Sequence, residues 1–158
     1  MHSRTSIPLM VVLLSLFLFF GCSSEPIKSG VEFASKEHFE LTNSYQNLLS
    51  ITLSAPSAGY VVLTGSGYLK MLYEGGTGWA SVSIGTNSGS ANTENETAVE
   101  IPAGSPNGGY NYPFSLTTVL SVEAGDHNFY MVGIRDPNPG TYYANSLKLT
   151  AIFVKARL

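Results

Sequence analysis

The sequence has one cysteine, little charge and no basic segment. Cys22 is the single cysteine among 158 residues, so no intrachain disulfide can form. Charged residues make up 12% of the chain, against roughly 25% in an average globular protein. The formal net charge is −3 and Lys and Arg do not cluster, whereas binding to nucleic acid needs a concentrated positive surface. Nucleic acid is therefore not an expected partner.

The sequence also lacks the motifs of common catalytic and metal sites. A zinc site needs three or four converging ligands, and His38 and His127 are far apart in the chain. No G-x-S-x-G segment, the elbow of a nucleophilic serine, occurs. Asp126 and His127 are adjacent, and adjacent side chains of an extended chain point to opposite sides. The sequence predicts no metal, no cofactor and no catalytic residue, so we expect a non-enzymatic protein.

A small acidic group lies in the most polar part of the chain. Glu94, Glu96 and Glu100 occur within or beside residues 86–97. Calcium takes six to eight oxygen ligands, and neither EF-hand spacing nor Asp is present here. We expect a solvated acidic loop, with calcium binding as the alternative.

The N-terminal residues have the pattern of a secretory signal peptide. Residues 1–6 are polar and include Arg4, residues 7–20 are almost wholly apolar, and Gly21 is small. Fourteen residues of helix reach about 21 Å, which is short for a membrane span of about 20 residues. We predict a signal peptide over residues 1–21, a tether over 22–30 and a folded domain over 31–158.

The end of this segment, Phe19-Phe20-Gly21-Cys22, resembles the lipobox of bacterial lipoproteins. The resemblance implies cleavage before Cys22, lipidation of its sulfur and, usually, acylation of the new amino group. Ser23 follows, which implies the outer membrane where a bacterium has two membranes. The alternative is an uncleaved anchor with Cys22 as an ordinary thiol.

Lipid is expected to provide the whole attachment to the membrane. Removing residues 1–21 removes Arg4 and no carboxylate, so the formal net charge becomes −4. A chain of this charge is not attracted to anionic lipid. Two or three acyl chains hold a protein durably, whereas one holds it marginally.

From Val31 onward the pattern is that of β-strands. Leu49, Ile51 and Leu53, for example, alternate with polar residues. Turn signals every 8–12 residues are typical of a sandwich or barrel, so we predict an antiparallel jelly-roll β-sandwich, with a single meander as the alternative. We expect 60–64 to be buried on both faces and 65–67 to link two strands. The expected strands cover residues 49–54, 60–64, 68–73, 79–84, 99–101, 114–122, 129–134 and 147–154, with long loops at 86–97 and 102–113 and a turn at 124–127.

The last third of the chain resembles the closing strands of C1q/TNF-like jelly rolls. The residues concerned are 118–126, with a Gly-Asp turn, then 129–132, and the Ser-containing final strand 145–154. The resemblance implies a ten-strand jelly roll that often trimerises and that acts by binding.

Aromatic residues near turns are the candidate ligand contacts. Tyr and Trp stack well on sugars and on partner proteins, and loops often carry binding residues. The alternative is that these rings cap the ends of the core. The candidates are Trp79, Tyr110, Tyr112, Tyr142 and Tyr143.

These observations together predict a lipid-anchored, non-enzymatic binding or interaction module of the cell envelope, with a glycan or protein ligand. One alternative is a structural envelope component that self-associates, for example as a homotrimer. Another is a glycan-cleaving enzyme, which would need two facing carboxylates about 5–10 Å apart.

Overall fold

The computed structural model describes residues 30–137 and 139–155. The predicted signal peptide, Cys22 and the tether up to residue 29 lie outside the described residues. The described part contains no helix with the length and apolarity that crossing a bilayer requires. Its elements are β1 (Val31–Glu40), β2 (Gln46–Ala55), β3 (Gly59–Tyr73), β4 (Gly78–Gly85), the 3-10 helix η1 (Thr93–Asn95), β5 (Glu96–Ile101), β6 (Gly108–Val122), β7 (Gly125–Arg135) and β8 (Gly140–Lys155).

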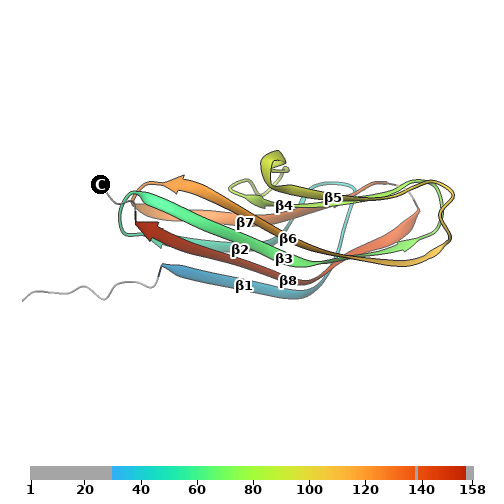
Figure 1. Cartoon of the computed structure of the whole chain (residues 1–158), viewed down its shortest axis with the longest axis horizontal. Coiled ribbons are helices and arrows are strands. Elements are labelled where there is room, and N and C mark those ends of the chain that lie inside the picture. Colours follow the sequence, from blue (N-terminus) through green and yellow to red (C-terminus); the bar gives the residue numbers. More distant parts are fainter. Residues whose placement is uncertain (1–29, 138, 156–158) are drawn as a thin grey trace, which may run out of the picture.

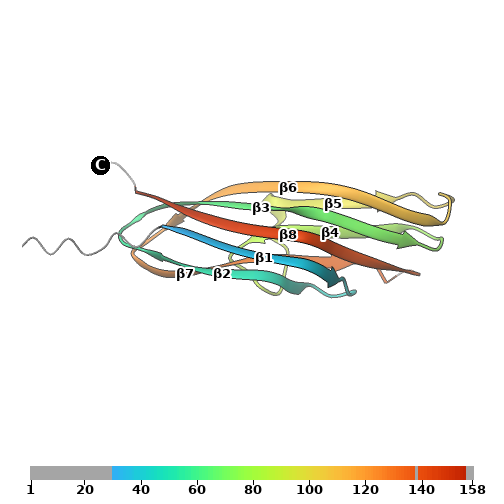
Figure 2. The ribbon, with the colours of Figure 1, turned by 90° about the horizontal axis from the view of Figure 1, so that it is seen from below.

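The strands form two antiparallel four-stranded sheets. We name them sheet A, with the order β1-β8-β3-β6, and sheet B, with the order β2-β7-β4-β5. Every connection between consecutive strands except β4 to β5 passes from one sheet to the other, which is the jelly-roll arrangement. The strands run along the long axis of the molecule, and β1 begins at the end where β8 finishes (Figures 1 and 2). The predicted antiparallel jelly-roll sandwich is confirmed, and the described part has eight strands where the C1q/TNF-like resemblance implies ten.

Alternating apolar residues from both sheets fill the space between them. In β3, for instance, Val61, Leu63, Leu69 and Met71 are fully buried. Their neighbours point to the other side of the sheet, because successive side chains of a strand alternate. Each such burial stabilises the fold by roughly 1.5–3 kcal/mol.

β8 changes phase in its middle. Tyr142 and Ala144 are buried, and so are Leu147 and Leu149, although an unbroken alternation cannot turn both pairs inward. The pairing of β8 with β3 shifts register at this point, and Ser146 has a φ of 48°. The extra residue of this β-bulge resets the alternation, so both halves of the long strand contribute to the core.

Two expectations about β3 are wrong. Residues 60–64 are not buried on both faces, since Tyr60 is 46% exposed while Val61 is buried. Residues 65–67 do not separate two strands but lie within one 15-residue strand. Gly65 is needed there because the sheets approach closely, and a Cβ on it would lie 2.7 Å from Cγ2 of Ile84.

Two predicted connections are also shorter than expected. β6 begins at Gly108, inside the predicted loop 102–113, and β7 begins at Gly125, inside the predicted turn 124–127. In both places pairing with a distant strand extends the ladder through residues with turn-like composition. The polar segment from residue 86 is a connection as predicted, and it contains η1 before β5 starts at Glu96.

Candidate binding face

The two outer faces of the sandwich differ in what covers them. The segment joining β4 to β5 folds over sheet B, where the backbone N–H of Asn92 donates to Oγ of Ser83 at 3.1 Å. The side-chain amide of Asn92 donates to the carbonyl of Ile84 at 3.2 Å. Ser81, which faces outward, is completely buried and donates its hydroxyl hydrogen bond to Glu96. The hydroxyls of Ser81 and Ser83 on sheet B therefore have partners within the chain.

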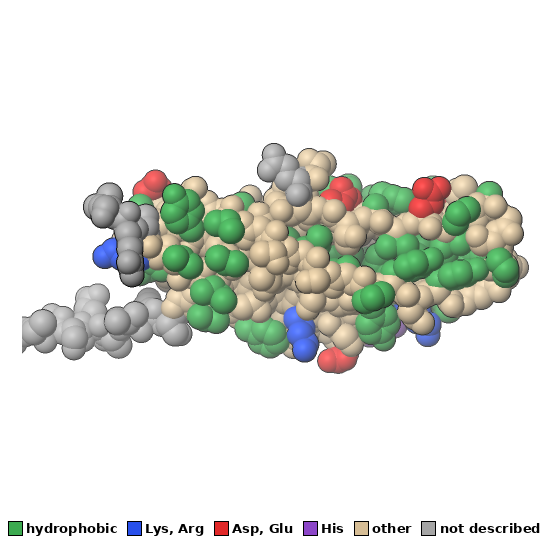
Figure 3. Space-filling view, in the orientation of Figure 1, with side chains coloured by type: hydrophobic (Ala, Val, Ile, Leu, Met, Phe, Trp, Pro, Cys, Tyr) green, Lys and Arg blue, Asp and Glu red, His purple; other side chains and the backbone are tan. Residues whose placement is uncertain are grey.

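The outer face of sheet A shows its side chains to solvent instead (Figure 3). Cross-strand register arranges these outward residues in rows across β1, β8, β3 and β6. The rows change character along the strands, from apolar through Ser and Thr to aromatic and polar. Such a gradient on one bare sheet makes this face the candidate functional surface.

The apolar rows lie at the end where the described chain begins. We call them the proximal cluster, which consists of Val31, Phe33, Tyr60, Val62, Val119, Ile152 and Val154. Beyond it, Thr64 pairs with both Thr117 and Thr150. Ser66 then pairs with Ser115 and Lys148. We call Thr64, Thr117, Thr150, Ser66 and Ser115 the hydroxyl belt, which separates the proximal cluster from the aromatic rows.

The distal rows contain a shallow, open depression of about 520 Å³. It is lined by Tyr68, Lys70, Asn111 and Pro113, from β3 and β6, and we call it the distal depression. Lys70 also pairs with Tyr143 on its other side. An ammonium group, an amide and aromatic rings can together hydrogen-bond to and stack on a polar ligand.

The neighbouring side chains hold this end of sheet A in place. Nδ1 of His38 donates to Oδ1 of Asn145 at 2.6 Å, and the His38 ring lies 4.5 Å from the Tyr143 ring, centroid to centroid. Asn145 is in register with Tyr68. The contacts tie the edge strand β1 to β8 beside the distal depression.

The structure does not bring the five predicted ligand contacts together. Tyr143 lies on the outer face of sheet A, whereas Trp79 points outward from sheet B, opposite Glu100. Tyr142 is fully buried, because the phase of β8 turns it inward. A ligand therefore cannot touch all five rings at one place.

Tyr110 and Tyr112 face the interior from the edge strand β6. They are in register with buried residues of β3, and both are half-buried against the core. Tyr110 meets the ring of Tyr73 edge-on at 6.2 Å and donates to the carbonyl of Pro106 at 2.8 Å. This position matches the alternative interpretation, in which the rings cap the core.

Sequence reasoning missed Tyr68, Lys70, Asn111 and Pro113. The available signal was local, since Tyr68 and Lys70 flank the buried Leu69 and must share the opposite face of the strand. Their meeting with Asn111 depends on pairing between β3 and β6, which no local pattern contains.

The two histidines considered for metal binding or catalysis lie on different sheets. His127 lies on sheet B and its Nε2 donates to the carbonyl of Glu123 at 2.8 Å, while His38 lies on sheet A. Among the residues that the structure describes, no group of three or more His, Cys, Asp or Glu is placed to hold a metal ion.

Two tyrosines have shifted pKa values because of their surroundings. Burial, and secondarily Asp136, raises the pKa of Tyr142 above its ordinary value of 10.0. Burial, and secondarily the charge of Glu96, raises the pKa of Tyr45. The hydroxyl of Tyr142 is buried and has no hydrogen-bond partner, so burial favours its neutral form in the fold.

Comparison with known proteins adds distant likenesses to solved structures. No protein-family model and no curated sequence matches the chain. The chain is similar to a structure of infectious bursal disease virus, Gx strain, with a TM-score of 0.43 and 11% identity over 80% of this chain and 32% of that one. It is also similar to the VP2 subviral particle of infectious bursal disease virus, with a TM-score of 0.46 and 11% identity over 78% of this chain and 32% of that one. The chain thus spans about a third of the length of these viral proteins.

Proposed function

We propose that the protein is a lipid-anchored, non-enzymatic binding module of the bacterial cell envelope. In this proposal Cys22 carries the lipid and the distal depression on sheet A contacts the ligand. The bare outer face of sheet A is the observation that carries the binding role, because the segment around Asn92 packs on part of the opposite face, at Ser83 and Ile84. The leader and the lipobox-like residues before Cys22 support the anchor.

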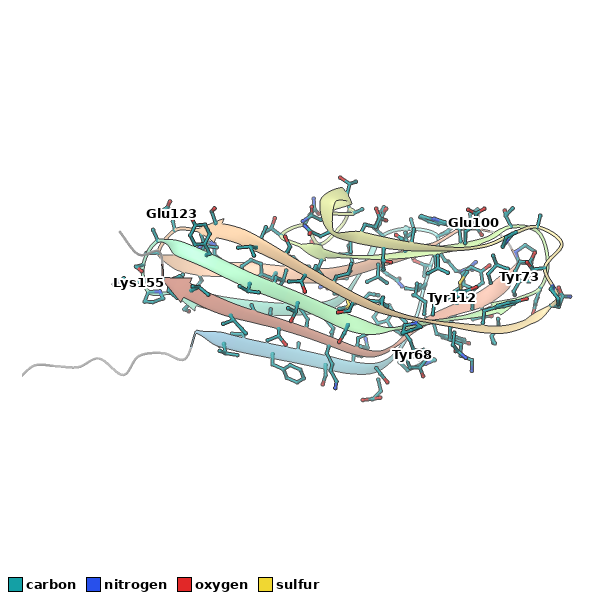
Figure 4. All side chains as sticks on the ribbon, in the orientation of Figure 1. Tyr68, Tyr73, Glu100, Tyr112, Glu123 and Lys155 are labelled. Atoms are coloured by element: carbon teal, nitrogen blue, oxygen red, sulfur yellow. The ribbon has the colours of Figure 1, made fainter. Side chains whose placement is uncertain are left out.

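The geometry of β1 suits presentation of a ligand site away from a membrane. β1 starts at Val31, directly after the proposed tether, and reaches the distal rows at His38. Seven residues of strand cover about 23 Å at roughly 3.3 Å each. Tyr68 accordingly lies well along the molecule from Lys155, which marks the end where the described chain also begins (Figure 4).

The side chains of the distal depression favour a glycan or a polypeptide as the ligand. The Tyr68 ring offers a flat apolar surface, and Lys70 and Asn111 offer hydrogen-bond donors. In the two rows that contain the depression, Glu40 is the single carboxylate among the described residues. Glycoside cleavage ordinarily uses two, and this supports binding without hydrolysis.

Mass spectrometry of the full chain, purified from a bacterial host, tests the anchor. We expect an N-terminus at Cys22 that carries the mass of the added acyl groups, and incorporation of labelled palmitate. The Cys22→Ser variant should incorporate none and should leave the membrane fraction. An unprocessed N-terminus with a free Cys22 thiol would overturn the anchor.

A glycan array and a pull-down from envelope extract test the binding role. Tyr68→Ala should weaken a specific signal at least about tenfold, as the loss of a central aromatic contact does. Thr86→Ala, at an exposed position beyond β4, is the matched control and should bind normally. Absence of any specific ligand in both assays, or equal loss in both variants, would contradict the proposal.

Self-association as a structural envelope component is the second candidate. The exposed apolar side chains of the proximal cluster favour it, since large exposed apolar patches commonly mark interaction surfaces. Light scattering on the leaderless protein decides, because a strict monomer at all concentrations would remove its support.

A further inference from the structure

We propose that the proximal cluster is a membrane-contact surface, which rests on the bilayer that holds the anchor. The inference rests on the proposed lipidation of Cys22 and goes beyond it. It assigns the apolar half of sheet A to the lipid surface and leaves the distal depression for the ligand.

The proximal cluster is unusually apolar for an exposed surface. Its most exposed members are Val119 at 59%, Phe33 at 58%, Val31 at 50%, Tyr60 and Val154 at 46% and Ile152 at 40%. Register pairs join Val31, Ile152, Val62 and Val119 across all four strands, Tyr60 pairs with Val154, and Phe33 lies in the next row beside Thr150. The cluster therefore extends across the whole width of the sheet. Figure 3 shows apolar side chains gathered at the left end of this face. A patch of this kind marks a protein or membrane interaction site.

The charges within the patch do not oppose contact with a lipid surface. The rows from Val154 to Ser115 on this face include Lys148 as their single charged side chain, and no carboxylate of the described residues lies in them. The chain as a whole is acidic, with a formal net charge of −3. Contact through these rows therefore buries no carboxylate that belongs to them, and Lys148 can reach the headgroups.

The position of the patch favours the bilayer over a soluble partner. Val31 belongs to the proximal cluster and is the first residue of β1. The nine residues from Cys22 to Gly30 can span at most about 32 Å when fully extended. An anchor at Cys22 thus holds the patch beside the headgroups at a high effective concentration. A soluble partner has no such attachment, whereas a second copy shares the anchor and is distinguished from the bilayer by the concentration dependence of contact without vesicles.

The hydroxyl belt then lies at the edge of the contact. Thr64, Thr117 and Thr150 follow the apolar rows along the strands, and their hydroxyls can hydrogen-bond to headgroups or to water. We expect the long axis of the sandwich to incline away from the membrane beyond this belt, so that the distal depression stays in water.

The test uses the chain from Ser23 onward, with an N-terminal hexahistidine bound to vesicles of phosphatidylcholine, phosphatidylglycerol and a nickel-chelating lipid. The tag replaces the acyl chains, so the result does not depend on the chemistry at Cys22. Among the described residues, the buried core residues all lie between Leu41 and Ala151. The chain has no other cysteine, which allows a single polarity-sensitive fluorophore at Val119→Cys or, as a control, at Thr86→Cys.

We expect a blue shift and a loss of iodide quenching at position 119 on vesicles, with neither at position 86. Adding Ile152→Ser should reduce the shift at position 119, and circular dichroism confirms that the variant is folded. Identical emission at both positions on vesicles would overturn the inference. A shift at 119 that appears without vesicles and grows with protein concentration would show that a second copy covers the patch, and would overturn it as well. Failure of palmitate labelling at Cys22, by contrast, removes the anchor and leaves the vesicle result unaffected.

Discussion

His38 and Asn145 are joined across the outermost pair of strands in sheet A, with Nδ1 of His38 donating to Oδ1 of Asn145 at 2.6 Å. Asn145 is one of the few buried polar residues, with 5% of its surface exposed. It immediately precedes Ser146, where the bulge resets the alternation of β8. The bond therefore ties the edge strand to its neighbour at the least regular point of the ladder.

Removing this donor should destabilise the fold measurably. His38→Leu leaves the amide oxygen of Asn145 unpaired, and we expect the free energy of unfolding to fall by about 1–3 kcal/mol. His38→Gln keeps an N–H donor at a similar reach and should lose less. Urea denaturation of both variants measures the difference, and an equal loss would show that packing, not the hydrogen bond, matters at His38.

The unpartnered hydroxyl of Tyr142 should destabilise the fold. Tyr142→Phe removes a buried polar atom that has no partner, so we expect the free energy of unfolding to rise by about 1 kcal/mol. Tyr73→Phe is the matched control, because the Tyr73 hydroxyl donates to the carbonyl of Gly76 and its loss should destabilise. Chemical denaturation gives both values, and the opposite order would contradict the prediction.

Gly78 and Tyr142 should show energetic coupling. A Cβ on Gly78 would lie 2.8 Å from the hydroxyl oxygen of Tyr142, so Gly78→Ala should lower the free energy of unfolding by about 1–3 kcal/mol. In the Tyr142→Phe background the same substitution should cost less, and a double-mutant cycle measures the difference. Gly89→Ala, where a Cβ meets nothing within 4 Å, should cost little. Additive effects of the two substitutions would show that the crowding lies elsewhere.

Stability should fall in alkaline solution. Burial raises the pKa of Tyr142 above 10.0, and burial also raises that of Tyr45. Below the pKa of about 10 that a tyrosine has in the unfolded chain, both residues contribute fully to the free energy of unfolding. This contribution is lost as the pH rises through the higher pKa of the folded state, because the unfolded chain releases its tyrosine protons more readily. Urea midpoints measured from pH 8 to pH 12 should show this decline, with a smaller slope in Tyr142→Phe. An unchanged slope in that variant would remove Tyr142 from the explanation.

The alternation of residues predicted much of the fold, because burial follows strand period wherever the period is regular. Leu49, Ile51 and Leu53 are buried as their pattern indicates. The prediction fails where long-range pairing overrides local composition, as at Tyr110 and Tyr112, which lie in a segment rich in Gly and Pro but pair with β3. Strand formation there depends on partners more than 35 positions away in the chain, which local propensity does not reflect.

The candidate site was harder to predict than the fold. Whether Tyr142 or Tyr143 faces outward depends on the bulge at Ser146, and no Gly marks that bulge in the sequence. Tyr68, Asn111 and Tyr143 belong to three separate strands. They lie close together because of the register between these strands. The pattern of a single sequence can indicate residues of a type suited to binding, but it cannot show which of them lie side by side.

The pairing of β1 with β8 also determines when sheet A can be completed. The first described strand pairs with the last one. In a nascent polypeptide, residues 31–40 therefore lack their partner strand until residues near 150 have been synthesised. Such long-range closure is intrinsically slow. A nascent chain of this protein therefore cannot complete sheet A until β8 has been synthesised, which gives any machinery that handles unfolded chains a wide interval in which to act.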